Sequence, residues 1–315
     1  MGKLSSVKLK SVSVTAVLSW IWLLLASGAS LGLSSCEPGE IVELSIFHTN
    51  DLHSQFHPPK SDPFGLGGVS RISTLRKTLA AARSRSVFLD AGDFSEGSWY
   101  YNIDTGANMM RIMSAMGYDA VVLGNHDYLA GPARIAETID EAAPAFSILA
   151  TNLDFATYQD EPGFRERVLP STVIVKDGIR IGVVGLTTMD YSFATYLAPL
   201  VATDPVEAAQ TEVARIKDSV DVVILLSHNS FSTNLQLARA VLGVHAVVSG
   251  HSHVKFASAQ LVENAGRQVP VVETGKWGAF LGELVLKVNA KDKVVTFGSY
   301  ELHPVSALSE NDAAV

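Results

Sequence analysis

Five short apolar runs in this chain are each followed at once by a group of Asp, Asn, His and Gly residues. This repeated arrangement constrains the fold more than any other feature of the sequence. The five polar groups are His48–His53, Asp90–Asp93, Gly124–Asp127, Ser227–Asn229 and Gly250–His253. Short runs rich in Val, Ile and Leu predict buried strands. Sites in α/β folds are built at the carboxyl ends of strands, where loops converge. The pattern therefore predicts strands whose ends meet at one site.

Amphipathic stretches with the period of a helix alternate with the apolar runs, which indicates α/β layers with sheets covered by helices. The predicted strands are Glu43–His48, Ser86–Asp90, Ala120–Leu123, Ser147–Ala150, Arg180–Gly185, Val222–Leu226, Ala246–Ser249, Val269–Val272 and Gly282–Val288. The predicted helices are Val69–Arg83, Ala107–Met116, Ala133–Glu141, Pro205–Ser219 and Asn234–Leu242. The 315 residues show no internal repeat and no Pro/Ser-rich linker. We therefore expect one α/β domain at 43–305 and a frayed tail at 306–315.

Seven residues of the polar groups are candidate ligands of divalent cations. They are Asp51, His53, Asp93, Asn125, His228, His251 and His253. Carboxylates, imidazoles and amide oxygens share such ions, and the single cysteine of the chain offers no thiolate here. Seven donors suit two ions a few Å apart with one bridging carboxylate.

Each group also has a purely structural interpretation. The segment 51–53 is compatible with an Asx turn, 92–93 with a simple turn, and 124–127 with a helix N-cap. His228 is compatible with a buried core histidine, and His251 and His253 with a solvated pair. Structural need rarely places five of nine histidines just beyond comparable strand ends of one chain, so the functional interpretation is favoured.

The N-terminus reads as an export signal. Met1–Lys10 is basic, Ala16–Leu33 is apolar and uncharged, and Leu33-Ser34-Ser35-Cys36 follows. This order predicts a lipoprotein-type signal peptide at 1–35, a lipid on Cys36 and a tether at 36–42. The protein would then be an exported lipoprotein of a bacterial cell envelope, facing the periplasm or the exterior. An uncleaved membrane anchor and a buried core cysteine are the alternatives.

The ordered motifs resemble those of the calcineurin-like metallophosphoesterases. They are Asp51-x-His53, Gly92-Asp93-x-x-x-Gly97, Gly124-Asn125-His126, Ser227-His228 and Gly250-His251-x-His253. The segments Leu44–His53, Gly67–Arg71 and Val272–Leu286 are similar to the N-terminal catalytic domain of secreted 5′-nucleotidases and UDP-sugar hydrolases. The resemblance spans about residues 43–289 and implies a four-layer α/β/β/α sandwich.

The resemblance also implies roles for the residues. The first ion would be held by Asp51, His53, Asp93 and His253, and the second by Asp93, Asn125, His228 and His251. Asp93 would bridge the ions. The implied function is hydrolysis of phosphate esters, above all of nucleotides to nucleosides and phosphate. A metal-bridging hydroxide would attack phosphorus, and His126 would assist the transition state. The two ions would be Zn, Mn, Fe or Mg.

Composition agrees with this interpretation. A net charge of −8 argues against a nucleic-acid polymer as partner, and bound cations would supply the positive charge that an anionic small-molecule substrate needs. The alternatives are a superfamily hydrolase of another ester, such as a sulfur-oxidation substrate, and a non-catalytic lipoprotein that binds metal or a partner.

Two features depart from the nucleotidase pattern. The family's full-length members carry a C-terminal domain that clamps the nucleobase, and this sequence ends at Val315, where that domain would begin. Nucleotidases also place an aspartate three residues after the catalytic histidine, and here that position is Leu129. Other branches of the superfamily support the histidine from three residues after the bridging aspartate, which here is Glu96. We therefore expect Glu96 to support His126, with Asp127 as a weaker candidate.

Overall fold

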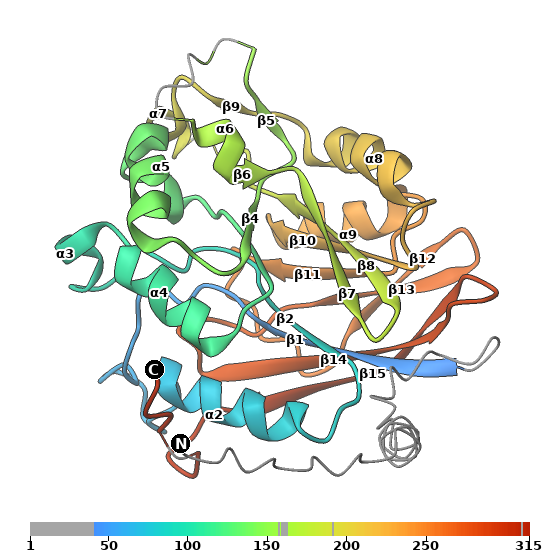
Figure 1. The fold of residues 1–315 in the computed structure, drawn as a ribbon, viewed down its shortest axis with the longest axis horizontal. Helices are drawn as coiled ribbons and strands as arrows, with labels where there is room; N and C mark the ends of the chain where they lie inside the picture. Colours follow the sequence, from blue (N-terminus) through green and yellow to red (C-terminus); the bar gives the residue numbers. More distant parts are fainter. Residues whose placement is uncertain (1–40, 157, 159–162, 191, 310) are drawn as a thin grey trace, which may run out of the picture. The chain divides into compact units, whose positions relative to one another are not determined.

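Two β-sheets pack face to face, and helices cover their outer faces (Figure 1). The computed structural model describes residues 41–156, 158, 163–190, 192–309 and 311–315. The predicted signal peptide, Cys36 and most of the tether lie outside the described residues. The four-layer α/β/β/α sandwich is confirmed.

The first sheet is mixed, and the second places four parallel strands beside antiparallel edge strands. The first runs in the order β15 (Val294–Pro304), β14 (Phe280–Asn289), β1 (Ile41–Thr49), β2 (Ser86–Asp90), β3 (Ala120–Val122), β4 (Ser147–Leu149) and β6 (Val168–Leu169). The second runs in the order β12 (Gln260–Asn264), β13 (Arg267–Val272), β11 (Ala246–Gly250), β10 (Val222–His228), β8 (Ile179–Leu186) and β7 (Ser171–Lys176). A small pair joins β5 (Leu153–Asp154) and β9 (Val201–Ala202).

The helices and one 3₁₀ turn lie in the connections between strands. They are α2 (Val69–Ala80), α3 (Tyr101–Asp104), α4 (Ala107–Met116), η1 (His126–Tyr128), α5 (Gly131–Ala142), α6 (Phe164–Arg167), α7 (Ala194–Leu197), α8 (Pro205–Ile216) and α9 (Phe231–Ala240). Within the described residues, no helix combines the length and apolar character that crossing a membrane requires.

The alternation of side chains along β1 explains the layers. Leu44 and Ile46 are buried between the two sheets, whereas Phe47 points to the opposite face and packs with residues of α2 and α4. Successive side chains of a strand point to opposite faces, so a strand buried on both sides is a nearly continuous apolar run. The same reasoning applies to β10, all of whose residues are buried.

Strand register brings the predicted site residues to one edge. β1 and β2 are parallel with Thr49 opposite Asp90, and β10 and β11 are parallel with His228 opposite Gly250. The carboxyl ends of neighbouring parallel strands therefore lie together. The loops that leave these strands begin at the same edge of each sheet.

All nine predicted strands are present, but several edge strands were missed. β7 and β15 lie at sheet edges, and β15 alternates exposed and partly buried residues instead of forming an apolar run. Predicted helix Asn234–Leu242 starts three residues earlier, at Phe231, because the Ser230 side chain accepts a hydrogen bond from Thr233 N and caps the helix. Ser232 and Thr233 follow Phe231 in the first turn and interrupt the apolar periodicity.

The C-terminal tail forms no helix or strand in the part that the structure describes. The Asp312 carboxylate nevertheless accepts a hydrogen bond from Ser73 Oγ at 2.6 Å and pairs with Lys77, both on α2. The domain boundaries and the fraying of 306–315 stay predictions, and these contacts tie at least Asp312 to the domain.

Candidate metal centre

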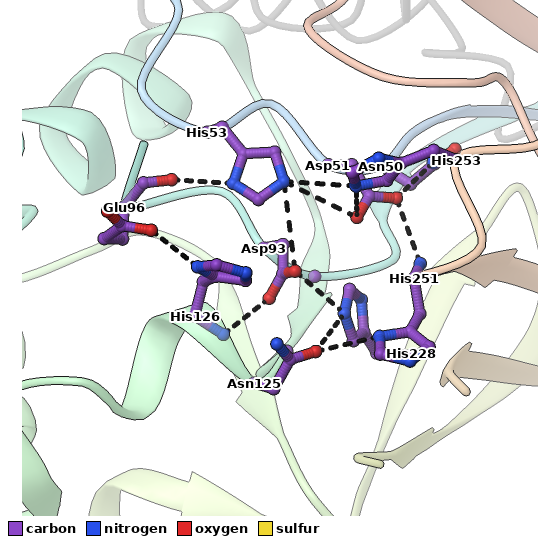
Figure 2. Close-up of polar contacts among 12 residues, drawn as sticks. Asn50, Asp51, His53, Asp93, Glu96, Asn125, His126, His228, His251 and His253 are labelled. Atoms are coloured by element: carbon purple, nitrogen blue, oxygen red, sulfur yellow. Dashed lines mark hydrogen bonds and ion pairs between the residues drawn. The ribbon is translucent and has the colours of Figure 1, made fainter. Parts of the chain in front are cut away.

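The five polar groups converge on one cluster at the strand ends of the two sheets, as Figure 2 shows. Five of its residues have positive φ angles, which non-glycine residues seldom adopt: Asp51 (51°), His53 (47°), Asp93 (56°), His251 (79°) and His253 (56°). A Cβ on Gly92 would lie 2.7 Å from His228 Nδ1, so only glycine allows the strand ends to approach this closely. Tight, strained turns thus aim the side chains inward.

The first half of the cluster consists of Asp51, His53 and His253. One donor atom of each lies within 4.8 Å of the others. His253 Nε2 lies 3.2 Å from Asp51 Oδ1 and 3.3 Å from His53 Nε2. Asp51 is fully buried, whereas the His253 side chain is 36% exposed. This half therefore opens to solvent on the His253 side.

The second half consists of Asp93, His228 and His251, joined by Asn125. His228 Nε2 lies 3.1 Å from Asp93 Oδ2 and 3.1 Å from Asn125 Oδ1, and His251 Nδ1 lies 2.8 Å from Asn125 Oδ1. Asp93 Oδ2 is also 4.0 Å from His53 Nε2 of the first half. The structure thus brings all seven predicted ligand residues together, with the Asp93 carboxylate between the halves.

The atoms of both halves that could bind a metal face one another. His53 Nδ1 donates to the Glu96 carbonyl at 2.7 Å, and His228 Nδ1 donates to the Ala91 carbonyl at 2.7 Å. Each ring therefore turns Nε2 toward the cluster. Among the described residues, the buried Asp51 Oδ1 has no hydrogen-bond partner and faces only the His253 and His53 rings. Converging acceptors of this kind need a proton or a metal ion between them, so the donor set fits two divalent ions.

The protonation of the cluster responds to its own charges. Burial lowers the pKa of His228, but the adjacent Asp93 carboxylate outweighs burial and raises it to about 10. Burial raises the pKa of Asp93, while His228, His53 and His126 together hold it well below its usual range. Burial lowers the pKa of both His53 and His251, which favours neutral rings. Metal binding would have to displace the proton shared by His228 and Asp93, so affinity should fall in acid.

His126 lies beside the cluster and is held by Glu96. The imidazole Nδ1 is 2.5 Å from Glu96 Oε2, and the His126 backbone N–H donates to Asp93 Oδ1 at 2.8 Å (Figure 2). Both side chains are about one-third exposed, 32% for His126 and 30% for Glu96. The Glu96 carboxylate thus contacts the His126 ring, which is the contact expected of a supporting carboxylate.

Asp127 has a different role. Its carboxylate accepts hydrogen bonds from the backbone N–H groups of Asp93 and Gly124 at 2.9 and 2.8 Å, and from Ser95 N and Oγ at 3.0 and 2.6 Å. Burial first, then the Asp93 charge, raises its pKa to about 6. These bonds tie the loop after β2 to the loop after β3. The geometry therefore favours Glu96 over Asp127 as the support of His126.

Asn50 is a site residue that the sequence analysis did not single out. Its Nδ2 donates to Asp51 Oδ2 at 2.6 Å and to the Gly275 carbonyl at 2.6 Å, and its Oδ1 accepts from Thr274 N at 2.9 Å. Asn50 thereby fixes the Asp51 carboxylate to the loop after β13. Its position beside Asp51 was the available signal, but the partner loop lies 224 residues away in sequence.

Comparisons with known proteins agree with this geometry. The chain is 31% identical over 301 residues to the 5′-nucleotidase of Mus musculus, covering 87% of this chain and 51% of that protein. Among solved structures, the 5′-nucleotidase precursor from Thermus thermophilus superposes with a TM-score of 0.76 at 30% identity, over 86% of this chain and 56% of that one. The chain thus spans about half the length of the curated relatives it matches.

A more distant neighbour shares the fold alone. The sulfate thiohydrolase SoxB from Thermus thermophilus has a TM-score of 0.72 at 17% identity, over 85% of this chain and 58% of that chain. The relatives support the prediction of a metal-dependent phosphoester hydrolase. The profile described as calcineurin-like phosphoesterase matches residues 44–255, which include every predicted ligand. With this match over most of its length, the chain belongs to the calcineurin-like phosphoesterase family.

Proposed function

We propose that this protein is a two-metal hydrolase of phosphate monoesters with 5′-nucleotidase-like activity. The observation that carries the proposal is the Asp93 carboxylate, which lies between His53 of one donor group and His228 of the other. Asp51, His53, Asp93 and His253 would hold one ion, and Asp93, Asn125, His228 and His251 the other. When bound, two divalent ions polarise phosphoryl oxygens and make water acidic enough to attack phosphorus near neutral pH.

The protein's own residues orient the His126 ring and supply a proton to the leaving group. Glu96 fixes the His126 ring through Nδ1 and so turns Nε2 away from that contact. Nε2 is then the atom from which His126 can donate a proton to the departing alcohol oxygen or stabilise charge on the phosphoryl group. Asn50 and Asp127 hold the two ligand loops in place. Relatives named 5′-nucleotidases support a nucleotide as the substrate.

Metal removal and reconstitution test the proposal. The protein would be stripped with a chelator, reloaded with Mn²⁺ or Zn²⁺, and assayed for phosphate release from AMP and from a generic aryl phosphate. We expect activity to return as two ions bind per chain. A protein that binds two ions yet releases phosphate from neither ester would instead support the non-catalytic alternative.

The proposal includes export and anchoring through a lipid on Cys36, supported by the basic lead, the apolar segment and the Leu33–Cys36 sequence. A Cys36→Ser variant should remain unprocessed or leave the membrane fraction. Mass spectrometry that finds unmodified Cys36 in the mature protein would contradict the anchor without affecting the proposed reaction.

A further inference from the structure

A cavity of about 200 Å³ lies directly beside the proposed metal centre. It is bounded by η1, the segment after β8, and α7 with the residues that follow it. Apart from Asn125, Thr188 and Asp190, its lining side chains are apolar or aromatic. Asn125 belongs both to this cavity and to the second donor group, so the cavity borders the metal centre.

The aromatic wall of the cavity also contacts the proposed proton donor. The Phe193 ring lies 5.0 Å from the His126 ring, centroid to centroid, at an angle of 52°. Leu197 and Leu200, which line the same cavity, are buried. A group that departs next to His126 therefore leaves beside an apolar surface.

A second cavity, of about 370 Å³, shares Thr188, Met189 and Asp190 with the first but is lined by more polar residues. Its other lining residues include Asn229, Ser230, Gln236 and His251. The segment 188–190 thus separates a polar cavity from an apolar one at the same metal centre. Hydroxyl-rich groups lose hydrogen bonds to water in the apolar cavity, whereas hydrocarbon groups gain from burial there.

We propose that the apolar cavity is a subsite for the alcohol portion of phosphate monoesters whose alcohol is apolar or aromatic. Hydrolysis adds water across the P–O bond, which breaks to give inorganic phosphate and the alcohol, whose oxygen takes a proton. The alcohol's carbon chain or ring lies against Phe193, Leu197 and Leu200. An engineered apolar cavity of about 150 Å³ accepts benzene, so this cavity holds one ring or a short alkyl chain. This inference rests on the proposed function.

Primary alkyl phosphates test the subsite, because ethyl, butyl and hexyl phosphate differ in chain length but hardly in the reactivity of the P–O bond. We expect kcat/KM to rise about two- to fourfold per methylene until the cavity is full; fourfold corresponds to full burial of a methylene, about 0.8 kcal/mol. The dissociation constants of the matching alkylphosphonates, measured by calorimetry, should fall with the same slope.

Two variants change the cavity in opposite ways. Phe193→Ala removes its aromatic wall, and Ala194→Phe fills it; both should flatten the dependence on chain length. The matched control is Phe64→Ala, which makes the same substitution at a phenylalanine that is 81% exposed and does not line the cavity. It should keep the wild-type slope.

The outcomes separate the subsite from the proposed function. If the wild type hydrolyses all three esters equally well, or both cavity variants keep the wild-type slope, the subsite is wrong and the phosphoesterase stands. If the metal-loaded protein hydrolyses no phosphate ester, the proposed function fails. In that case, the affinity for alkylphosphonates could still rise with chain length and fall in Phe193→Ala. This result would support the apolar binding cavity without the proposed hydrolysis.

Discussion

Two histidines at the ends of central strands, His48 on β1 and His228 on β10, are both completely buried but lie in opposite environments. In the part of the chain that the structure describes, neither ring nitrogen of His48 has a hydrogen-bond partner. Its ring stacks on Tyr300 at 5.8 Å, and burial lowers its pKa to about 3. His228 donates to Ala91 O and faces Asp93, which raises its pKa to about 10 in spite of burial.

The difference teaches that burial at a strand end does not by itself make a histidine chemically active. Desolvation disfavours the charged ring in both places. Only a neighbouring carboxylate and oriented acceptors convert the buried ring into a group that holds a proton or a metal. His48 is therefore part of the packing of its sheet, whereas His228 belongs to the candidate metal centre.

The largest effect is expected when the Asp93 carboxylate, which makes His228 differ from His48, is removed. Asp93→Asn should lose both ions, because Asp93 lies between the two donor groups, and activity should fall roughly a thousandfold or more, as when residues act as a unit. Elemental analysis and phosphate release measure the two effects. Two ions retained in this variant would overturn the bridging role.

Replacing the two histidines separately sharpens the contrast. His228→Ala should lose the ion of the second half while the first half keeps Asp51, His53 and His253. His48→Phe retains an aromatic ring against Tyr300 and should keep both ions. Metal content of the two purified variants, measured side by side, decides the matter; an ion lost from His48→Phe would place His48 in the metal centre.

Glu96→Gln tests whether a carboxylate also activates the more exposed His126. Turnover should drop about 10- to 1000-fold with both ions bound, because general acid–base contributions are of this size. The control is Glu137→Gln, which changes an exposed carboxylate of α5. In a His126→Ala background Glu96→Gln should cost little. If the losses of turnover in Glu96→Gln and His126→Ala add fully in the double variant, Glu96 does not act through His126.

The smallest effect concerns stability in acid. The folded-state pKa of His48, about 3, lies below the usual value of 6.5. As pH falls below 6.5, His48 binds a proton in the unfolded chain but stays neutral in the folded protein. The free energy of unfolding therefore decreases progressively toward pH 3. Between pH 6.5 and about pH 4.5 the loss amounts to about 2 to 3 kcal/mol.

His48→Phe should remove this part of the acid sensitivity. Urea unfolding of both proteins at several pH values measures it, and the difference between the two curves isolates His48 from the other titrating groups. Parallel curves for wild type and variant would show that His48 gains a proton without cost in the folded state.

The sequence was informative where the signal was local. Apolar runs ending in His, Asp or Asn located the central strands and the cluster, because strand burial and strand-end loops leave a pattern along the chain. The resemblance allowed the ligands to be assigned to two halves, and two of the three donor groups seen in space, Asp51–His53–His253 and Asp93–His228–His251, fall within those halves. The position of Glu96 relative to Asp93 likewise led to its contact with His126.

What could not be predicted depends on side chains that meet across long sequence separations. The carboxylate of Asp127 turns back to Asp93 and Ser95, and Asn50 reaches the loop at Gly275. Neither contact leaves a periodic trace. The cavity beside Phe193 likewise forms only when η1 and α7 come together. The edge strand β15 was missed because its half-exposed residues form no continuous apolar run, whereas β7 carries the short run Val173–Val175, which was overlooked.

The positive φ angles of the cluster have an evolutionary consequence. Asp51, His53, Asp93, His251 and His253 each hold the backbone in a conformation that costs about 1 to 3 kcal/mol for a residue with a side chain. Selection for stability alone would weigh this backbone cost against the hydrogen bonds that each side chain makes. A descendant released from metal binding should therefore drift to glycine first at His253, and later at Asp51 and Asp93, whose buried carboxylates accept hydrogen bonds from backbone N–H groups of neighbouring loops. The identity of these five residues records whether hydrolysis is still under selection.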